Sequence, residues 1–139
     1  MDDCLVLDPS LILSWFIEDE HHDYAQQLRK TLEEGTLALV PSGWQQAIVD
    51  MLLHVERSQQ IKPTHANQAL ALIQGLPIRS VDNTAPDRIN HCLRIARETG
   101  LEADKATLLE LALYKTIPLA TADEELSKTA KALGIRVNG

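Results

Sequence analysis

Apolar residues fall along this chain in two patterns, short uninterrupted runs and longer stretches with a spacing of three and four. The short runs predict strands, and the longer stretches predict amphipathic helices between them. The predicted strands cover residues 4–7, 37–40, 78–81, 119–120 and 135–137. The predicted helices cover residues 9–16, 20–34, 42–58, 63–75, 84–100, 103–115 and 124–133. This alternation predicts an α/β fold, with a mostly parallel sheet of four or five short strands surrounded by about seven helices.

Capping residues mark the ends of several predicted helices. Asp8 is expected to cap the first helix, with Pro9 at its first position. Ser42 is expected to cap the third helix in the same way. Gly100 and Gly134 stand where two later helices should end.

The helix predicted at residues 84–100 illustrates how a core face is chosen from spacing. Ile89, Cys92, Leu93 and Ala96 recur at intervals of three and four positions. We therefore expect these four residues to face the core.

The bulk composition describes one domain with an aliphatic core. The chain has 139 residues, 45% of them hydrophobic and only 4% aromatic, and no repeat or linker divides residues 1–139. The formal net charge is −7, which argues against tight, unassisted binding to nucleic acid. It leaves open an RNA held through metal ions, or a basic protein partner.

Several other classes of protein and site are not supported by the sequence. Cys4 and Cys92 are too few for a disulfide framework and are expected to act as small hydrophobic residues. His21 and His22 are adjacent and should diverge at a helix start, so a zinc site is not expected. The acidic amino terminus is not that of a signal peptide, and no apolar run has the length of a membrane span. We expect a cytoplasmic protein that does not enter membranes.

Two aspartates carry the most specific chemical signal. Asp8 ends the first apolar run, and Asp123 follows the last long one. The carboxyl ends of parallel strands gather at one edge of a sheet, where ligand sites form. Carboxylates meeting there suggest a divalent metal ion, and such an ion suggests phosphate chemistry.

Six motifs in order along essentially the whole chain resemble PIN domains, and in particular the short toxins of the VapC type. No single motif is very specific, but their order is hard to obtain by chance. They are Leu5–Ser10 followed by Trp15-Phe16 and acidic residues, Val40-Pro41 leading to Trp44, Leu76-Pro77-Ile78, Gly100–Ala103 before an Ala/Leu-rich helix, Leu119–Leu126, and Ala132–Val137.

The resemblance implies a metal-dependent endoribonuclease. Three or four carboxylates would form one acidic pocket holding Mg²⁺ or Mn²⁺, which would activate a water molecule and stabilise charge on the phosphate. The substrate would be single-stranded RNA or tRNA. The resemblance also implies a homodimer and a small antitoxin protein as partner.

Carried over one position at a time, the family's acids are only half retained. Asp8 matches the first acid and Asp123 the fourth. Each can equally serve as a helix cap or first-turn acid. The second acid should stand at Ala47, so its carboxylate is missing, and Asp50 lies almost one turn further along the same helix. Asp50 is either a partial substitute or a solvated helix residue.

The third acid should stand at residue 105, which is a lysine. Asp104 is its neighbour, but consecutive helical residues point about 100° apart. Asp104 therefore replaces the acid only if the helix start is irregular, and is otherwise a first-turn acid. The ammonium of Lys105 is expected to reach the pocket and pair with Asp8 or Asp123, supplying the charge that a metal supplies elsewhere. The predicted catalytic and metal residues are thus Asp8, Asp104 and Asp123, modified by Asp50 and Lys105.

Three functions remain open at this point. The first is a PIN-type ribonuclease with Mg²⁺ or Mn²⁺. The second is a PIN-like module with a degraded site and no cofactor, which acts by binding itself or an antitoxin-like protein. Its contact surface would be the helix at 63–75, or Trp15-Phe16 unless these two residues belong to the core, as such residues more often do. The third is a receiver-like signalling domain, phosphorylated on an aspartate at a strand end. It is the weakest, because no lysine follows the late strand before Lys128.

Overall fold

Five parallel strands form one sheet in the computed structural model of this chain, which describes residues 3–138. The strands are β1 (Cys4–Leu7), β2 (Leu37–Pro41), β3 (Ile78–Val81), β4 (Leu119–Ala120) and β5 (Val137–Asn138). Their order across the sheet is β3-β2-β1-β4-β5. Every neighbouring pair is parallel. The predicted α/β architecture is therefore confirmed.

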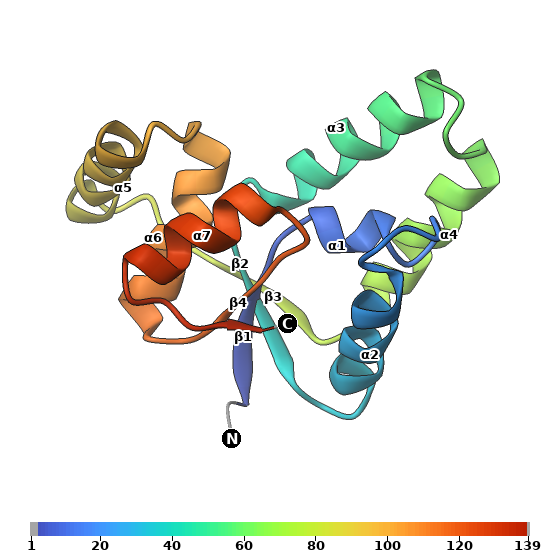
Figure 1. Cartoon of the computed structure of the whole chain (residues 1–139), viewed down its shortest axis with the longest axis horizontal. Coiled ribbons are helices and arrows are strands. Elements are labelled where there is room, and N and C mark those ends of the chain that lie inside the picture. The colour runs from blue at the N-terminus through green and yellow to red at the C-terminus, as the bar shows by residue number, and fades with distance from the viewer. Residues whose placement is uncertain (1–2, 139) are drawn as a thin grey trace.

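Seven helices complete the described part of the chain. They are α1 (Ser10–Leu13), α2 (His22–Glu33), α3 (Trp44–Arg57), α4 (Pro63–Gln74), α5 (Pro86–Thr99), α6 (Ala103–Lys115) and α7 (Glu124–Ala132). Figure 1 shows α1, α2 and α4 on one side of the sheet and α5, α6 and α7 on the other. This division follows from right-handed crossovers, because the chain moves outward along the sheet up to β3 and then returns past β1 to β4.

The strand order creates a crevice between β1 and β4. Successive connections leave these two neighbouring strands in opposite directions, so the loops after them diverge. Val6 pairs with Leu119 and Leu7 with Ala120 in this part of the sheet. The residues just after β1 and β4 are consequently brought together, although they lie at opposite ends of the chain.

Two tryptophans fix the helices that flank this crevice. The indole Nε1 of Trp44, at the start of α3, donates to the carbonyl oxygen of Leu7 at 2.7 Å. Trp15, after α1, donates to the carbonyl oxygen of Ala25 at 2.7 Å. Both tryptophans are buried. Each buried N–H thus has an acceptor, as the interior of a protein requires. Of the two alternatives for Trp15, a surface contact or a place in the core, the structure shows the core, and Phe16 is half-buried against it.

The predicted caps of the first and third helices are displaced. Helix α1 begins at Ser10, after Pro9, and the Asp8 carboxylate accepts from the Ser10 N–H. Helix α3 begins at Trp44, and the Ser42 hydroxyl donates to the carbonyl oxygen of Val81 instead of capping the helix. Asp8 therefore still contacts the first residue of the helix that follows it, whereas Ser42 serves a contact outside its helix.

The last strand begins two residues later than the sequence pattern suggests. Gly134 adopts a left-handed φ of 84°, and the Ile135 N–H donates to the carbonyl oxygen of Ala130. The Gly134 N–H donates to that of Lys131. These two bonds form a Schellman motif that ends α7. Because the motif uses its N–H, buried Ile135 does not pair in the sheet, and β5 starts at Val137.

The expected core face of α5 is only partly correct, because Cys92 and Ala96 are half-buried against the core but Ile89 and Leu93 are not. Ile89 and Leu93 are 52% and 49% exposed, whereas Arg88 and Ile95 are buried. The buried face is rotated because α5 packs on α6, which supplies buried Glu110 as an ion-pair partner for Arg88. The spacing of apolar residues predicted one buried face, but the Arg88–Glu110 ion pair buries a different one.

Candidate functional site

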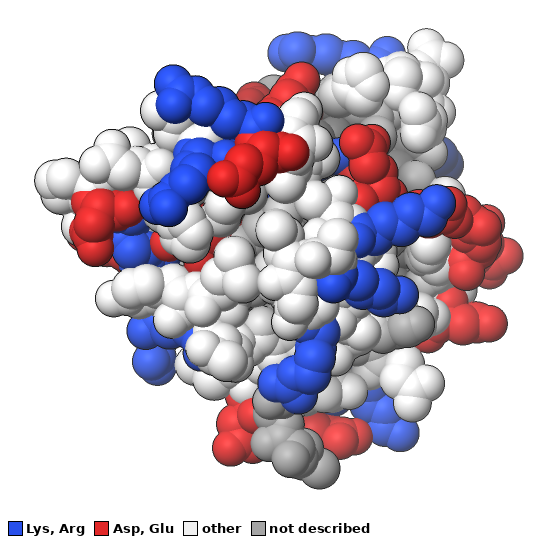
Figure 2. All heavy atoms as spheres, turned by 60° about the vertical axis from the view of Figure 1, so that its left-hand side comes forward, with Lys and Arg blue, Asp and Glu red and all other residues white. Residues whose placement is uncertain are grey.

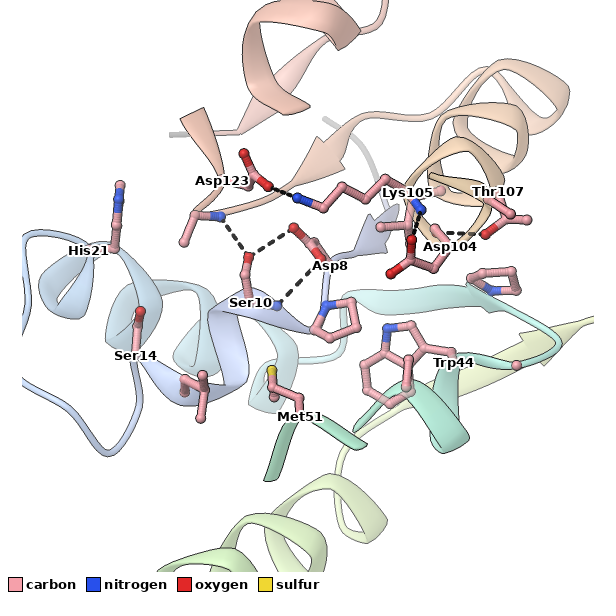
Figure 3. Close-up of a pocket in the computed structure, with 18 of the residues that line it drawn as sticks. Asp8, Ser10, Ser14, His21, Trp44, Met51, Asp104, Lys105, Thr107 and Asp123 are labelled. Atoms are coloured by element: carbon pink, nitrogen blue, oxygen red, sulfur yellow. Dashed lines mark hydrogen bonds and ion pairs between the residues drawn. The ribbon is translucent and has the colours of Figure 1, made fainter. Parts of the chain in front are cut away.

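A cleft of about 760 Å³ opens at the carboxyl ends of β1 and β4. Figure 3 shows its labelled lining residues, which come from segments far apart in the sequence. Asp8, Asp104, Lys105 and Asp123 all line it, and so does Ala47. The structure therefore brings three of the predicted acids and the predicted lysine to one site.

Asp50 does not reach this cleft. It is exposed and lies with Gln45, Gln46 and Val49 on another surface of α3. One helical turn separates Ala47 from Met51, and both of these face the cleft. Asp50 is rotated about 100° away from Met51, so its carboxylate does not replace the one missing at Ala47.

Asp8 is held by donors from two loops. Its Oδ2 accepts from the Thr121 hydroxyl at 2.5 Å and from the Ser10 hydroxyl at 2.8 Å. Its Oδ1 accepts from the Ser10 N–H at 3.4 Å. The Ser10 hydroxyl in turn accepts from the Ala122 N–H at 3.1 Å. The carboxylate thus ties the start of α1 to the loop after β4.

Burial dominates the protonation of Asp8. The side chain is 7% exposed, and this burial raises the pKa of Asp8. The hydrogen bonds from Thr121 and Ser10 act in the opposite direction, and the charge of Asp123 adds to the rise. The ionised form of Asp8 is therefore less favoured here than in water.

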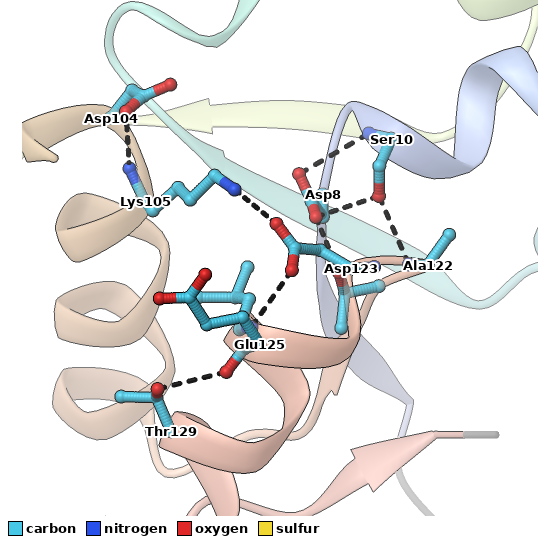
Figure 4. A network of polar contacts seen from close by, with 10 residues as sticks. Asp8, Ser10, Asp104, Lys105, Ala122, Asp123, Glu125 and Thr129 are labelled. Atoms are coloured by element: carbon cyan, nitrogen blue, oxygen red, sulfur yellow. Dashed lines mark hydrogen bonds and ion pairs between the residues drawn. The ribbon is translucent and has the colours of Figure 1, made fainter. Parts of the chain in front are cut away.

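Lys105 and Asp123 form an ion pair across the cleft. The ammonium of Lys105 contacts Asp123 Oδ2, as Figure 4 shows. This is the contact expected from the sequence. Asp123 Oδ1 accepts from the Leu126 N–H at 3.1 Å, so Asp123 also caps α7. One carboxylate therefore serves both the ion pair and the helix end.

The ion pair sets the protonation of both partners. The hydrogen bond to Asp123 raises the pKa of Lys105, against the smaller effect of burial. Burial acts to raise the pKa of Asp123, but the hydrogen bond from Lys105 and the Leu126 N–H outweigh it and hold that pKa below its usual value. Both groups are charged around neutral pH.

Asp104 is an exposed acid in the first turn of α6. Its Oδ1 accepts from the Lys105 N–H at 3.0 Å. It lines the cleft, so the ordinary first-turn role and a place at the site are both present.

Thr121 and Ser10 were missed as site residues in the sequence. Both stand within quoted motifs, beside the two aspartates, and their hydroxyls hold Asp8. A hydroxyl residue immediately after a buried strand was the available signal.

The histidines behave largely as expected. His22 Nδ1 lies 2.7 Å from the carbonyl oxygen of Ser14, while His21 Nε2 lies 3.4 Å from Glu20, so the two rings diverge. At the rim of the cleft, Glu20, His21 and Glu124 place one potential ligand atom each within 4.8 Å of one another. Both glutamates are exposed.

Comparison with known proteins supports the fold. No protein-family model matches the sequence, and no curated protein sequence is significantly similar to it. Among solved structures, PAE2754 from Pyrobaculum aerophilum is similar with a TM-score of 0.64 and 18% identity, over 96% of this chain and 82% of that one. VapBC2 from Rickettsia felis, bound to a DNA fragment from its promoter, is similar with a TM-score of 0.64 and 11% identity, over 97% of both chains. At such identities the likeness establishes a PIN-like α/β fold.

This topology also excludes the receiver-like alternative. Receiver domains have the strand order 2-1-3-4-5, whereas the order here is β3-β2-β1-β4-β5. Within residues 3–138, no helix combines the length and apolar character needed to cross a membrane.

Proposed function

We propose that this chain is a VapC-like PIN module that acts by binding a small antitoxin-like protein in its cleft, with metal-dependent cleavage of RNA lost or greatly weakened. The observation that carries the proposal is the Lys105–Asp123 ion pair, which occupies the position where a metal-dependent nuclease needs free carboxylates. Asp8 is engaged as well, because its oxygens accept from two hydroxyls and one backbone N–H.

The lining of the cleft supports binding of a protein segment. Much of the wall is apolar, and such walls with a few polar groups are typical of binding sites. The apolar members are Pro9, Leu13, Ile17, Pro41, Trp44, Ala47, Met51, Ala103, Leu108 and Ala122. Asp19 and Asp104 add acidic groups to this lining. An apolar segment with basic flanks complements these features, and the net charge of −7 favours a basic partner.

The solved neighbour VapBC2 provides the analogy for the partner. By that analogy we propose a small protein encoded beside this chain's gene. Co-expression should give a stable complex with the native chain. Met51→Arg, in the wall of the cleft, should abolish that complex. Val49→Arg, on an exposed position of the same helix, should leave it intact. Equal effects of the two substitutions would contradict binding in the cleft.

A second candidate is the metal-dependent endoribonuclease itself. Asp8, Asp104 and Asp123 line one cleft at the strand ends, and this grouping of carboxylates favours the nuclease. In that case Mg²⁺ or Mn²⁺ would be held by these three carboxylates, and the substrate would be single-stranded RNA or tRNA.

Cleavage of a labelled single-stranded RNA separates the two candidates. The native chain and Asp8→Asn should be compared at low salt, with Mn²⁺, with Mg²⁺ and with EDTA. We expect no metal-dependent cleavage by either protein. Cleavage by the native chain that is lost in Asp8→Asn and in EDTA would establish the nuclease instead.

A second copy of the chain is the partner we propose for the outer face of α5 and α6. Ile89 and Leu93 lie one turn apart on α5, and Tyr114 of α6 is 57% exposed. The Arg88 guanidinium stacks on the Tyr114 ring at 3.7 Å. Aromatic and apolar residues of this kind are enriched in protein interfaces.

Charge favours self-association at this face. The exposed charged residues of α5 are two acids and two bases, namely Asp87, Arg94, Arg97 and Glu98. They sum to zero on a chain whose net charge is −7. Figure 2 likewise shows both signs of charge interspersed with uncharged surface where the α5–α7 side of Figure 1 comes forward. Two copies can meet here without the repulsion that their overall charge imposes elsewhere.

A further inference from the structure

The ammonium of Lys105 lies beside two acids of the cleft, Asp123 and Asp8, as Figure 4 shows. It contacts Asp123, the cap of α7, and its positive charge is stabilised by Asp8 after β1 and by neighbouring Asp104. Figure 4 shows the lysine side chain extending from α6 toward Asp123, with Asp8 close by. The ammonium of Lys105, a cation that belongs to the chain itself, is thus already present where the acids of the cleft converge.

The residues of this cleft do not fit a divalent ion. Mg²⁺ requires an octahedral set of oxygen ligands at short range. Asp123 uses Oδ2 for Lys105 and Oδ1 for the Leu126 N–H. Asp8 uses both oxygens for Ser10 and Thr121. Ala47 adds only a methyl group to the lining.

Repulsion adds to this shortage of ligands. An ammonium in direct contact with Asp123 would stand a few ångströms from any ion bound by the same carboxylate. Like charges this close repel each other, and the repulsion is strongest where water is partly excluded. A divalent ion would experience a larger penalty. The lysine also has an entropic advantage, because it is tethered and need not be recruited from solution.

We propose that Lys105 is a tethered replacement for the divalent ion, and that its charge is what keeps Mg²⁺ and Mn²⁺ out of this cleft. Neutralising Lys105 frees Asp123 Oδ2 and leaves Asp8, Asp104 and Asp123 around an uncompensated negative site. Such a variant takes up Mn²⁺, whereas the native chain does not. The inference rests on the proposed function, since both hold that the native cleft works without a metal.

Direct titration of Mn²⁺, followed by electron paramagnetic resonance and calorimetry, tests this proposal without any assay of activity. The native chain should show no saturable site that depends on Asp123. Lys105→Gln should bind Mn²⁺ at least about tenfold more tightly, given the size of the charge term removed. It should also gain thermal stability on adding Mn²⁺, because a ligand of the folded state stabilises that state.

Three further variants locate the effect. Lys105→Arg retains the charge and should bind no more Mn²⁺ than the native chain. Lys128→Gln removes a lysine on the exposed side of α7 and should also match the native chain. Adding Asp123→Asn to Lys105→Gln should abolish the new site. Binding that persists in this double variant would overturn the assignment to the cleft.

Two results would overturn the proposal as a whole. Saturable Mn²⁺ binding by the native chain that is lost in Asp123→Asn would show that Lys105 does not exclude the ion, whereas binding that survives this substitution belongs to the Glu20, His21 and Glu124 group. Absence of binding in Lys105→Gln, with the fold intact by circular dichroism, would show that the lost carboxylate and the engaged Asp8 exclude it instead. The co-expression test is independent, because equal effects of Met51→Arg and Val49→Arg would refute binding in the cleft while leaving the exclusion of Mn²⁺ in place.

Discussion

Helix α6 takes part in two ion pairs that differ in burial, geometry and location. At Glu110 it accepts both Nε and Nη2 of Arg88 on α5, at 2.5 and 2.7 Å, with side chains only 1% and 7% exposed. At Lys105 it makes a single contact to Asp123 at the start of α7, with side chains 39% and 22% exposed. The first pair lies between two helices, and the second lies in the cleft.

The difference separates a structural contact from one that is open to exchange. A bidentate pair removed from water is geometrically fixed, and breaking it leaves a buried charge. A single, half-exposed contact is screened by water and contributes little to stability. Lys105 can therefore be replaced or displaced without unfolding the protein, as a residue at a functional site must allow.

The largest expected effect is on the buried pair. Arg88→Met should lower the free energy of unfolding by about 3 kcal/mol or more, because buried Glu110 loses both bonds from Arg88 and keeps only the long contact with His91 Nδ1, at 3.9 Å. Urea unfolding followed by circular dichroism measures this. The double variant Arg88→Met/Glu110→Leu should recover much of the loss. If the free energy of unfolding of Arg88→Met is within about 1 kcal/mol of that of the native chain, the buried pair contributes no more than an exposed one.

The next largest effect is expected for Asp8→Asn, whose stability relative to the native chain depends on pH. Burial raises the folded-state pKa of Asp8 above the unfolded value of 3.8. Its protonation therefore stabilises the fold at low pH, and this contribution is lost as pH rises through the folded-state pKa. Asp8→Asn should be at least as stable as the native chain at neutral pH.

The advantage of Asp8→Asn should shrink as pH falls toward 3.8. Parallel urea titrations of both proteins across this range would show it. Thr121→Ser, which keeps the hydroxyl donor to Asp8, is the matched control and should follow the native profile. An advantage that grows on acidification would mean that Asp8 is held ionised rather than destabilised.

The pair in the cleft should have a small effect on stability. Lys105→Gln and Asp123→Asn should show a coupling of roughly 0.5 kcal/mol in a double-mutant cycle, because both side chains are partly exposed. The coupling is present at neutral pH. It is lost as pH falls through the lowered pKa of Asp123, and as pH rises through the raised pKa of Lys105. A coupling as large as that of the buried Arg88–Glu110 pair would contradict the proposed difference between the two ion pairs.

The smallest effect on stability is expected at the outer face of α5. Ile89→Ser combined with Leu93→Ser should change the free energy of unfolding by no more than about 0.5 kcal/mol per substitution in the monomer, because both side chains are half-exposed. The same change should convert a dimer to a monomer in analytical ultracentrifugation. A native chain that is monomeric at high concentration would refute the second-copy proposal.

The strands and most helices could be predicted because local spacing and caps determine them. The failures have tertiary causes. The core face of α5 was partly misjudged because Arg88 finds Glu110 on another helix, and β5 was displaced because Ile135 donates its N–H to the end of α7. At the cleft, Asp8 and Asp123 followed from strand ends, and the contact of Lys105 followed from the resemblance to PIN domains. The direction of the Asp50 side chain and the hydrogen bond from Thr121 to Asp8 could be found only from the three-dimensional structure.

The pairing of β1 with β4 also bears on how the protein is made. The bond from Thr121 to Asp8 joins residues 113 positions apart, so one wall of the cleft is synthesised long after the other. A nascent chain lacks the site until the loop after β4 has left the ribosome. Contacts of such long range also form slowly, because the intervening loop must close first. Any activity or partner recognition of this cleft is therefore delayed until this later segment has emerged.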